Sequence, residues 1–490
     1  MTCSLANVSD LDSTQASKDC EHVTPEVDDG VYELHFVEFD DQGWLYPDKP
    51  ASGDKLAAQP SHQIDHLMER LRQILEQHDD LSIIVFVHGW KHGAQLDDRN
   101  VVEFRKLLQS LGDLENSRPR PRKVVGVYVA WRGKSWELPD PMLSLSFWAR
   151  KEAAKRVSVG SARELFARLR AIRRHYNAPA PGKLATGAAS ERAAARPRIR
   201  MLMIGHSFGG LILYAAMSNS LIEALTAQQD LKNCESGEDI VDRPADMIVL
   251  VNPAFEASRY EALYHVAYNY NPKQFQPPLL VSVTSTADWA TGIAFPVGRS
   301  VNTFFEHPIT SSDEEIAMKK TPGHISRYLT HRLYGHAPGT PSGANNAAPG
   351  SSVDCPSTGA SATDRQKLQC KEGYKAVEDA ICQNKAQEDE LSTDFFRQNL
   401  TPDLLLLKPK WVRRFYGGAS LTPVDGNDDG VRNSNAVVWN VEADGDVIKS
   451  HDDVMNCTFL AFMRQLYADV SSHPVTKLVP QRCDSTCSRP

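Results

Sequence analysis

A serine stands between two glycines in the run Gly205-His206-Ser207-Phe208-Gly209. The residues before it, 199–204, form an apolar stretch of strand length, and those after it, 210–217, have the composition of a buried helix. At a sharp turn from strand to helix the glycines leave room for a tight backbone, and the serine side chain is pushed out of the sheet. This context predicts a serine exposed for attack on a carbonyl carbon. The alternative is a glycine-rich turn that carries a surface serine.

A serine hydroxyl is a weak nucleophile at neutral pH, so it needs a base, and the base needs an acid to orient it. In a sheet of this kind the chain order is serine, acid, histidine. Asp288 follows the predicted strand 279–284 by four residues and is the preferred acid. The alternative interpretation is that Asp288 only begins a turn or caps a helix. The weaker rivals are Asp242, Asp246 and Asp313. Asp246 precedes a strand, which places it at the wrong edge of the sheet.

The preferred base is His451, which follows the last predicted strand by the acidic loop 442–446 and directly precedes a helix. A histidine on a loop at the carboxyl edge of the sheet is well placed to reach a serine there. His324 and His331 also come after Asp288, but they lie in a segment, 323–331, that looks helical and is not led by a strand.

An oxyanion that forms during attack on a carbonyl needs preorganised donors, usually two backbone N–H groups. Phe208, directly after the serine, is expected to supply one. Trp90 is expected to supply the other, because an apolar strand ends just before it in His88-Gly89. His88 and His92 have the i,i+4 spacing of metal ligands, but they fall where a loop is expected, so no metal is predicted there.

Short apolar runs alternate with stretches of helical periodicity along the chain. This alternation predicts an α/β fold with a doubly wound, mostly parallel sheet. The predicted strands are 31–39, 81–87, 124–131, 199–204, 247–251, 279–284 and 436–441. The predicted helices are 64–78, 101–111, 210–217, 364–398 and 455–467, with a further basic helix whose apolar stripe is Leu165, Phe166, Leu169 and Ile172.

The composition along the chain predicts one catalytic domain interrupted by an insertion. Residues 1–30 are polar and acidic and are expected to be disordered. Residues 31–335 form the main part of the domain, and a low-complexity stretch followed by a polar helical stretch, 336–400, forms the insertion. Residues 401–470 then supply the last strand and helix, and 471–490 are a tail. The insertion could serve as a lid or as a tether.

The net charge of −8 argues against a general nucleic-acid binder. The segment 150–200 nevertheless carries fourteen Lys and Arg against three Glu, a local charge of +11. We interpret it as the solvated face of surface helices. The alternative is peripheral contact with an anionic membrane. As written, the sequence predicts neither a signal peptide nor a transmembrane segment, so cytoplasmic and secreted or lipoprotein-like locations both stay open.

Neither a metal nor an organic cofactor is expected. The nine cysteines include no C-x-x-C pair, which argues against zinc, while disulfides stay possible. The run 425–430 matches the first half of a calcium loop, but Ala436 stands where the loop needs a bidentate Glu, so an acidic turn is preferred. No dinucleotide-binding fingerprint is present, and an oxidoreductase is therefore disfavoured.

Together, the His88-Gly89-Trp90 turn, the serine turn at 205–209, Asp288 after a strand and His451 before a terminal helix resemble the α/β-hydrolase superfamily. The resemblance covers roughly residues 80–470. More narrowly, the aromatic residue after His-Gly and the His-Asp-Asp run at 451–453 resemble its poorly characterised esterase/lipase-like branch.

The resemblance implies that Ser207 is the nucleophile of a catalytic triad, that His451 is the general base and acid, and that Asp288 is the orienting carboxylate. It implies a nucleophile elbow at Gly205, His206 and Gly209, an oxyanion hole at Trp90 and Phe208, and cleavage of a carboxylic ester through an acyl-enzyme. Three alternatives stay open: a lipase or phospholipase at a lipid surface, acyl transfer to an acceptor other than water, and a catalytically idle binding module. The superfamily hosts many chemistries, so the substrate is not specified beyond a small-molecule ester or a lipid.

Overall fold

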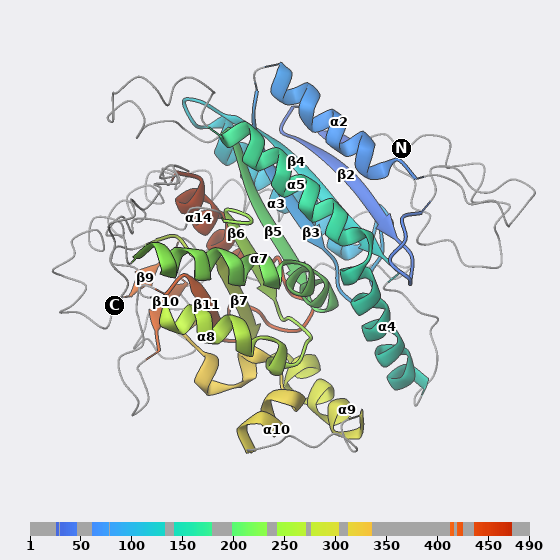
Figure 1. Ribbon diagram of the computed structural model, residues 1–490, viewed down its shortest axis with the longest axis vertical. Coiled ribbons are helices and arrows are strands. Elements are labelled where there is room, and N and C mark those ends of the chain that lie inside the picture. The colour runs from blue at the N-terminus through green and yellow to red at the C-terminus, as the bar shows by residue number, and fades with distance from the viewer. Residues whose placement is uncertain are drawn as a thin grey trace, which may run out of the picture.

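A single eleven-stranded sheet organises the part of the chain that the structure describes. In this computed structural model the described residues are 26–28, 30–46, 61–77, 79–132, 142–178, 198–232, 243–270, 276–302, 312–335, 412–415, 419–424 and 436–472. The strand order is β1-β2-β4-β3-β5-β6-β7-β11-β8-β10-β9 (Figure 1).

The sheet is mostly parallel, since every neighbouring pair from β2 to β8 runs in the same direction. The antiparallel pairs lie at the two edges, β1 with β2 and β8 with β10 and β9. The central strands are buried on both faces, which explains why they are continuous apolar runs. The bounds are β1 Glu26–Asp28, β2 Tyr32–Phe39, β3 Asp80–Val87, β4 Arg122–Trp131, β5 Ile199–His206, β6 Met247–Val251, β7 Leu280–Ser285, β8 His331–Tyr334, β9 Arg413–Arg414, β10 Ser420–Pro423 and β11 Val438–Ala443.

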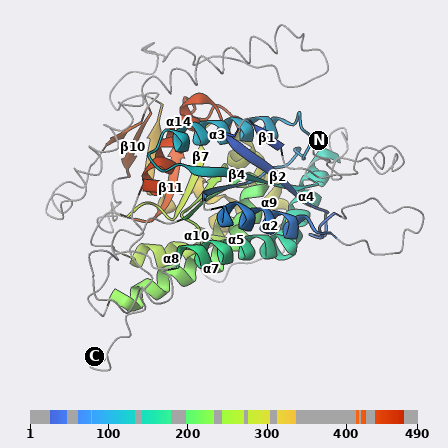
Figure 2. The same ribbon diagram turned by 90° about the horizontal axis from the view of Figure 1, so that it is seen from above.

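Helices cover both faces of the sheet, as Figure 2 shows. One face packs against α2, α5, α7 and α8, and the other against α3 and α14. The expected α/β class with a mostly parallel sheet is confirmed. The helix bounds are α2 Gln63–Glu76, α3 Arg99–Asn116, α4 Met142–Val159, α5 Ser161–Asn177, α7 Phe208–Lys232, α8 Glu261–Asn269, α9 Phe295–Asn302, α10 Ser312–Lys319 and α14 Cys457–Ser472.

The basic helix α5 packs through the apolar stripe expected from its sequence. Leu165, Phe166, Leu169 and Ile172 are all buried, because residues spaced three and four apart lie on one face of a helix. The helix α7 is the one described helix that is long and apolar enough to cross a membrane, over Phe208–Ala227. Most of this stretch is buried against the sheet and against α4, α5 and α8.

Cations of the basic segment make contacts within the protein. Arg150 pairs with Asp41, Arg168 with Asp65, and the fully buried Lys151 with Glu256. These three cations are therefore paired with carboxylates of the described part of the chain.

The structure differs from the sequence-based expectations at the edges of the sheet. Residues 26–28, expected to be disordered, form the edge strand β1. The segment 323–331, expected to be helical, consists of two short 3₁₀ turns, Pro322–His324 and Ser326–Tyr328, and then begins β8. Strands β9 and β10, which were not expected, pair beyond β8. Residues 471–472 of the predicted tail complete α14, while its remainder, 473–490, and the insertion at 336–400 lie outside the described residues.

Candidate active site

Ser207 lies at the turn between β5 and α7 with a left-handed backbone, φ 54°. Such a conformation is uncommon for residues other than glycine and stores local strain. The flanking glycines are required by close backbone approach. A Cβ atom on Gly209 would lie 2.0 Å from the carbonyl oxygen of Val87, and one on Gly205 would lie 2.7 Å from that of Gly209. The sequence pattern therefore corresponds to a real steric constraint.

Backbone hydrogen bonds hold the strained serine from the neighbouring strand end. The Ser207 amide donates to the carbonyl oxygen of Val251 at 3.0 Å, and the Ala254 amide donates to that of Ser207 at 3.1 Å. The turn is therefore fixed by the segment that follows β6, and Ser207 itself is almost fully buried.

The side chains of Ser207, His451 and Asp288 form a continuous hydrogen-bonded chain. Nε2 of His451 lies 2.8 Å from Oγ of Ser207, and Nδ1 lies 2.9 Å from Oδ2 of Asp288. With Asp288 ionised, the imidazole donates through Nδ1–H, which leaves Nε2 to accept from the serine hydroxyl. Asp288 is inaccessible to solvent, whereas the side chain of His451 is 21% exposed. The three residues singled out from the sequence therefore meet at the carboxyl edge of the sheet.

The environment tunes both ionisable members of this chain. Burial lowers the pKa of His451, but the hydrogen bond and the negative charge of Asp288 outweigh burial and raise that pKa above its ordinary value of 6.5. Burial raises the pKa of Asp288, yet the hydrogen bonds from His451 and Thr291 outweigh it and lower that pKa. Asp288 is therefore a carboxylate at neutral pH that stabilises a positive charge on His451.

Asp288 is held by the first turn of the segment that follows it. Its Oδ1 accepts hydrogen bonds from the amides of Ala290 at 2.9 Å and Thr291 at 3.2 Å. Its Oδ2 accepts one from the Thr291 hydroxyl, whose oxygen lies 3.0 Å from Nε2 of His324. His324, a rival for the base from sequence, therefore lies behind the acid and bonds to Thr291.

The two residues expected to supply the oxyanion donors, Phe208 and Trp90, lie in segments next to Ser207. Phe208 is the first residue of α7, so its N–H has no acceptor within the helix. The turn that contains Trp90 lies against the serine, since a Cβ atom on Gly89 would be 2.9 Å from Cβ of Ser207. The residue after Trp90, Lys91, has a left-handed φ of 68°, which marks a sharp turn.

His88 supports this turn through both of its ring nitrogens. Its Nδ1–H donates to the carbonyl oxygen of Gly89 at 2.8 Å, and its Nε2 accepts from the amide of Trp131 at 3.0 Å. Burial lowers the pKa of His88 to about 4, so it is neutral at physiological pH. His92 instead lies 3.0 Å from Asp98, the residue that caps α3.

Aromatic rings pack against the side chains of Trp90 and Phe208. Phe147 on α4 packs 4.9 Å from Phe208 and 5.4 Å from Trp90, measured between ring centroids. Phe295 lies 6.4 Å from Phe147 and comes from the segment that follows Asp288. Aromatic side chains therefore line this side of the site.

The remaining candidates for the acid and the base are not part of the triad. Asp246 lies at the amino end of β6, the wrong edge as expected, where it pairs with Arg173 and Arg200. Asp313 is an exposed residue at the start of α10, and Asp242 lies outside the described residues. His331 is buried in β8 against Trp439, and burial lowers its pKa to about 3.

One set of side chains in the described part of the chain has metal-ligand spacing. The ligand atoms of His206, His451 and Asp452 lie within 4.8 Å of one another. Both ring nitrogens of His451 are already engaged in the triad, so a cation there would compete with those hydrogen bonds. The calcium-like run 425–430 lies outside the described residues.

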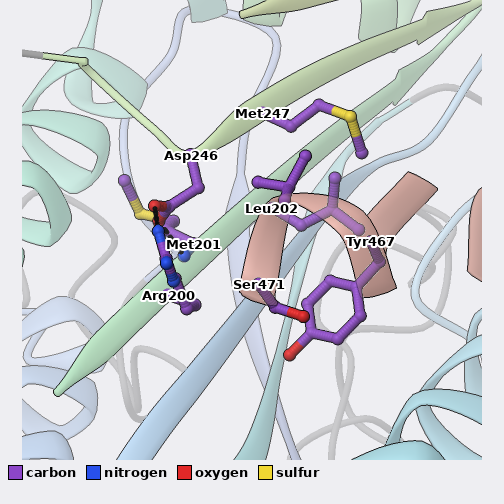
Figure 3. Close-up of a pocket in the computed structure, with 8 residues that line it drawn as sticks. Arg200, Met201, Leu202, Asp246, Met247, Tyr467 and Ser471 are labelled. Carbon is purple, nitrogen blue, oxygen red and sulfur yellow. Dashed lines mark hydrogen bonds and ion pairs between the residues drawn. The ribbon is translucent and has the colours of Figure 1, made fainter. Parts of the chain in front are cut away.

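A small cavity lies at the amino ends of β5 and β6, between the sheet and α14, whereas Ser207 follows the carboxyl end of β5 (Figure 3). It measures about 10 Å³, room for no more than about one water molecule. Arg200 and Asp246 line one side, and Tyr467 and Ser471 of α14 line the other. This cavity is a packing feature far from Ser207 along the strands.

Sequence reasoning missed the residues that surround the triad, above all Asn252 and Thr291. A signal was available for Asn252, since an Asn-Pro pair directly after an apolar strand marks a sharp turn at the carboxyl edge.

No protein-family model matches the chain, and neither a curated protein nor a solved structure is significantly similar to it.

Proposed function

We propose that the protein is a serine hydrolase that cleaves carboxylic esters through an acyl-enzyme. The observation that carries this proposal is the Ser207–His451–Asp288 chain, with hydrogen bonds of 2.8 and 2.9 Å. A serine on a strained turn between strand and helix, with the order serine, acid, histidine along the chain, is the arrangement of α/β-hydrolases. The strand-to-helix geometry and the parallel sheet support membership of that fold.

In the proposed reaction His451 Nε2 accepts the proton of Ser207 as Oγ attacks the ester carbonyl carbon. The amides of Phe208 and Trp90 donate to the oxyanion, and the buried carboxylate of Asp288 stabilises the imidazolium. His451 then protonates the departing alkoxide. Water, deprotonated by His451, attacks the acyl-enzyme and releases the carboxylic acid and the free serine.

Hydrolysis of p-nitrophenyl esters of increasing acyl length tests this proposal, with Ser207→Ala as the inactive comparison. We expect p-nitrophenolate release by the wild type, a preference among chain lengths, and loss of activity in Ser207→Ala. Ser218→Ala is a matched control, because Ser218 lies on α7 beyond the serine turn, and this variant should keep wild-type activity. A flat profile near zero for the wild type contradicts ester hydrolysis and favours the idle-module alternative.

A lipid surface as the site of action is the second candidate. Trp289 directly follows Asp288, and Ile293 and Val297 come four and eight residues after Trp289; all three side chains are more than half exposed. Large apolar side chains gathered beside a hydrolase site favour contact with lipid. Binding to zwitterionic phosphatidylcholine vesicles that is lost in Trp289→Ser/Ile293→Ser supports it, and the absence of vesicle binding by the wild type removes it.

A further inference from the structure

Asn252 directly follows β6 in a left-handed conformation, φ 45°, and its side chain bonds to the backbone of His451 and of Ser285. It is fully buried. Asparagine and glycine tolerate this backbone region better than other residues. We propose that Asn252 is a positioning residue that fixes the serine turn and the histidine loop relative to each other, an inference that rests on the proposed hydrolase function.

The backbone around Asn252 holds the nucleophile. The two hydrogen bonds that fix Ser207 come from the residues on either side, Val251 and Ala254. The Asn252 amide itself donates to the carbonyl oxygen of Val283 on β7 at 2.8 Å. The turn at Asn252 is therefore hydrogen-bonded to β7, and its neighbouring residues hydrogen-bond to Ser207.

The side chain of Asn252 holds the base. Its Nδ2 donates to the backbone carbonyl oxygen of His451 at 3.1 Å. The same oxygen accepts a second hydrogen bond, at 2.9 Å, from Nε2 of the buried His206. Nδ1 of His206 has no partner among the described residues, so the single proton of the neutral ring belongs on Nε2. Two fixed donors thus anchor the loop that carries the imidazole.

The other end of the Asn252 amide reaches toward the acid. Its Oδ1 accepts from the amide of Ser285, the last residue of β7, at 2.9 Å. The Ser285 hydroxyl donates to the carbonyl oxygen of Ile448 at 2.6 Å, and the Ser285 carbonyl accepts from the amide of Asp288 at 3.2 Å. One amide side chain therefore bridges the strand that leads to Asp288 and the loop that leads to His451.

This arrangement uses both functions of the amide, which suggests a pair of variants. Asn252→Gly keeps the left-handed backbone without strain and removes both side-chain bonds. Asn252→Asp keeps an acceptor for Ser285 and removes the donor to His451. Asn177→Ala is the matched control. Asn177 also exchanges hydrogen bonds with a backbone amide and a backbone carbonyl, those of Ile199, but at the opposite edge of the sheet.

The test measures esterase kinetics, the rate of labelling by a fluorophosphonate, and the low-field proton resonance of His451 Nδ1–H in the resting protein. We expect kcat and the labelling rate to fall about 10- to 100-fold in both Asn252 variants, with KM within about twofold, because a small misplacement of reacting groups is costly. We expect the Nδ1–H resonance to broaden or shift in both Asn252 variants. We expect it to be unchanged in Asn177→Ala, even if that variant loses as much melting temperature as the Asn252 variants do.

Asn252→Gly that is labelled at the wild-type rate and keeps the wild-type resonance overturns this inference and leaves the proposed function intact. A wild type that is neither labelled nor active overturns the proposed function instead. A loss of rate in Asn252→Gly that Asn177→Ala reproduces, with the resonance unchanged in both, shows that Asn252 contributes only to stability and also overturns the inference.

Discussion

The hydroxyl of Thr291 donates a hydrogen bond to Oδ2 of Asp288, the same oxygen that faces His451. The acid therefore receives a bond from the turn that follows it and a bond from the base. This arrangement restricts rotation of the carboxylate and lets one residue, three positions along the chain, influence the orientation of the imidazole.

Replacement of Thr291 tests that influence. We expect Thr291→Val to lower kcat about tenfold, because one hydrogen bond to a charged group is worth on the order of 1.5 kcal/mol. Thr291→Ser keeps the hydroxyl and should retain most of the activity. Steady-state kinetics on a p-nitrophenyl ester measure both, and equal activity in the Val and Ser variants would contradict a role for the hydroxyl.

Removal of the negative charge at Asp288 should be far more damaging. Asp288→Asn favours the wrong imidazole tautomer, and in comparable triads the loss is about 10⁴-fold in kcat. The control is Asp313→Asn, at an exposed acid that was a rival in sequence. A fall of less than about tenfold in Asp288→Asn, or an equal fall in Asp313→Asn, would argue against the assigned acid.

The pH dependence of kcat/KM follows from the state of His451. The base must be neutral to accept the serine proton, and Asp288 raises the pKa of His451 above 6.5. Activity should therefore be complete at alkaline pH and fall as the pH drops through that raised pKa. The midpoint of the acid limb is measured for the wild type and for Asp452→Asn, because the charge of Asp452 also raises this pKa. The midpoint should move to lower pH in the variant, and an acid limb well below 6.5 in the wild type would contradict the assignment.

Asp246 should matter for stability and not for the chemistry. It is fully buried and accepts hydrogen bonds from Arg173, Arg200 and the amide of Met201. Removal of one partner of a buried ion pair costs about 3–5 kcal/mol, so Asp246→Ala should lower the free energy of unfolding by that amount. Asp65→Ala, which breaks an exposed pair with Arg168, should cost about 1 kcal/mol or less.

The sign of the pH effect at Asp246 can also be stated. Burial raises its pKa, but the two guanidinium groups outweigh burial and lower it well below the ordinary 3.8. The stabilisation is therefore present above about pH 4 and is lost as the pH falls toward the lowered value. Denaturant unfolding at pH 7 and pH 3 should show the difference between wild type and Asp246→Ala shrink at pH 3. A difference that grows at pH 3 would contradict this account.

Strand-length apolar runs and helical periodicity were sufficient to predict the central strands and most helices, because residues such as Leu165 and Val85 have one structural role, burial. The convergence of Ser207, Asp288 and His451 was also accessible, since the carboxyl ends of parallel strands meet at one edge. The edge strands β8 to β10 could not be predicted from the sequence, because they are short and their pairing depends on partners distant in sequence. The Asn-Pro pair indicates a turn at Asn252, but the role of its side chain comes from contacts with residues far along the chain. The role of Thr291 depends on a side-chain rotamer that places its hydroxyl on Asp288, and the residue type alone does not encode this.

The most direct test of the central claim is to identify the residue that a fluorophosphonate modifies and to ask whether its reactivity depends on His451. Peptide mapping of the labelled wild type should place the adduct on Ser207 alone, and His451→Ala should be labelled at least about 10³-fold more slowly. An adduct on another residue, or labelling of His451→Ala at the wild-type rate, would contradict the account.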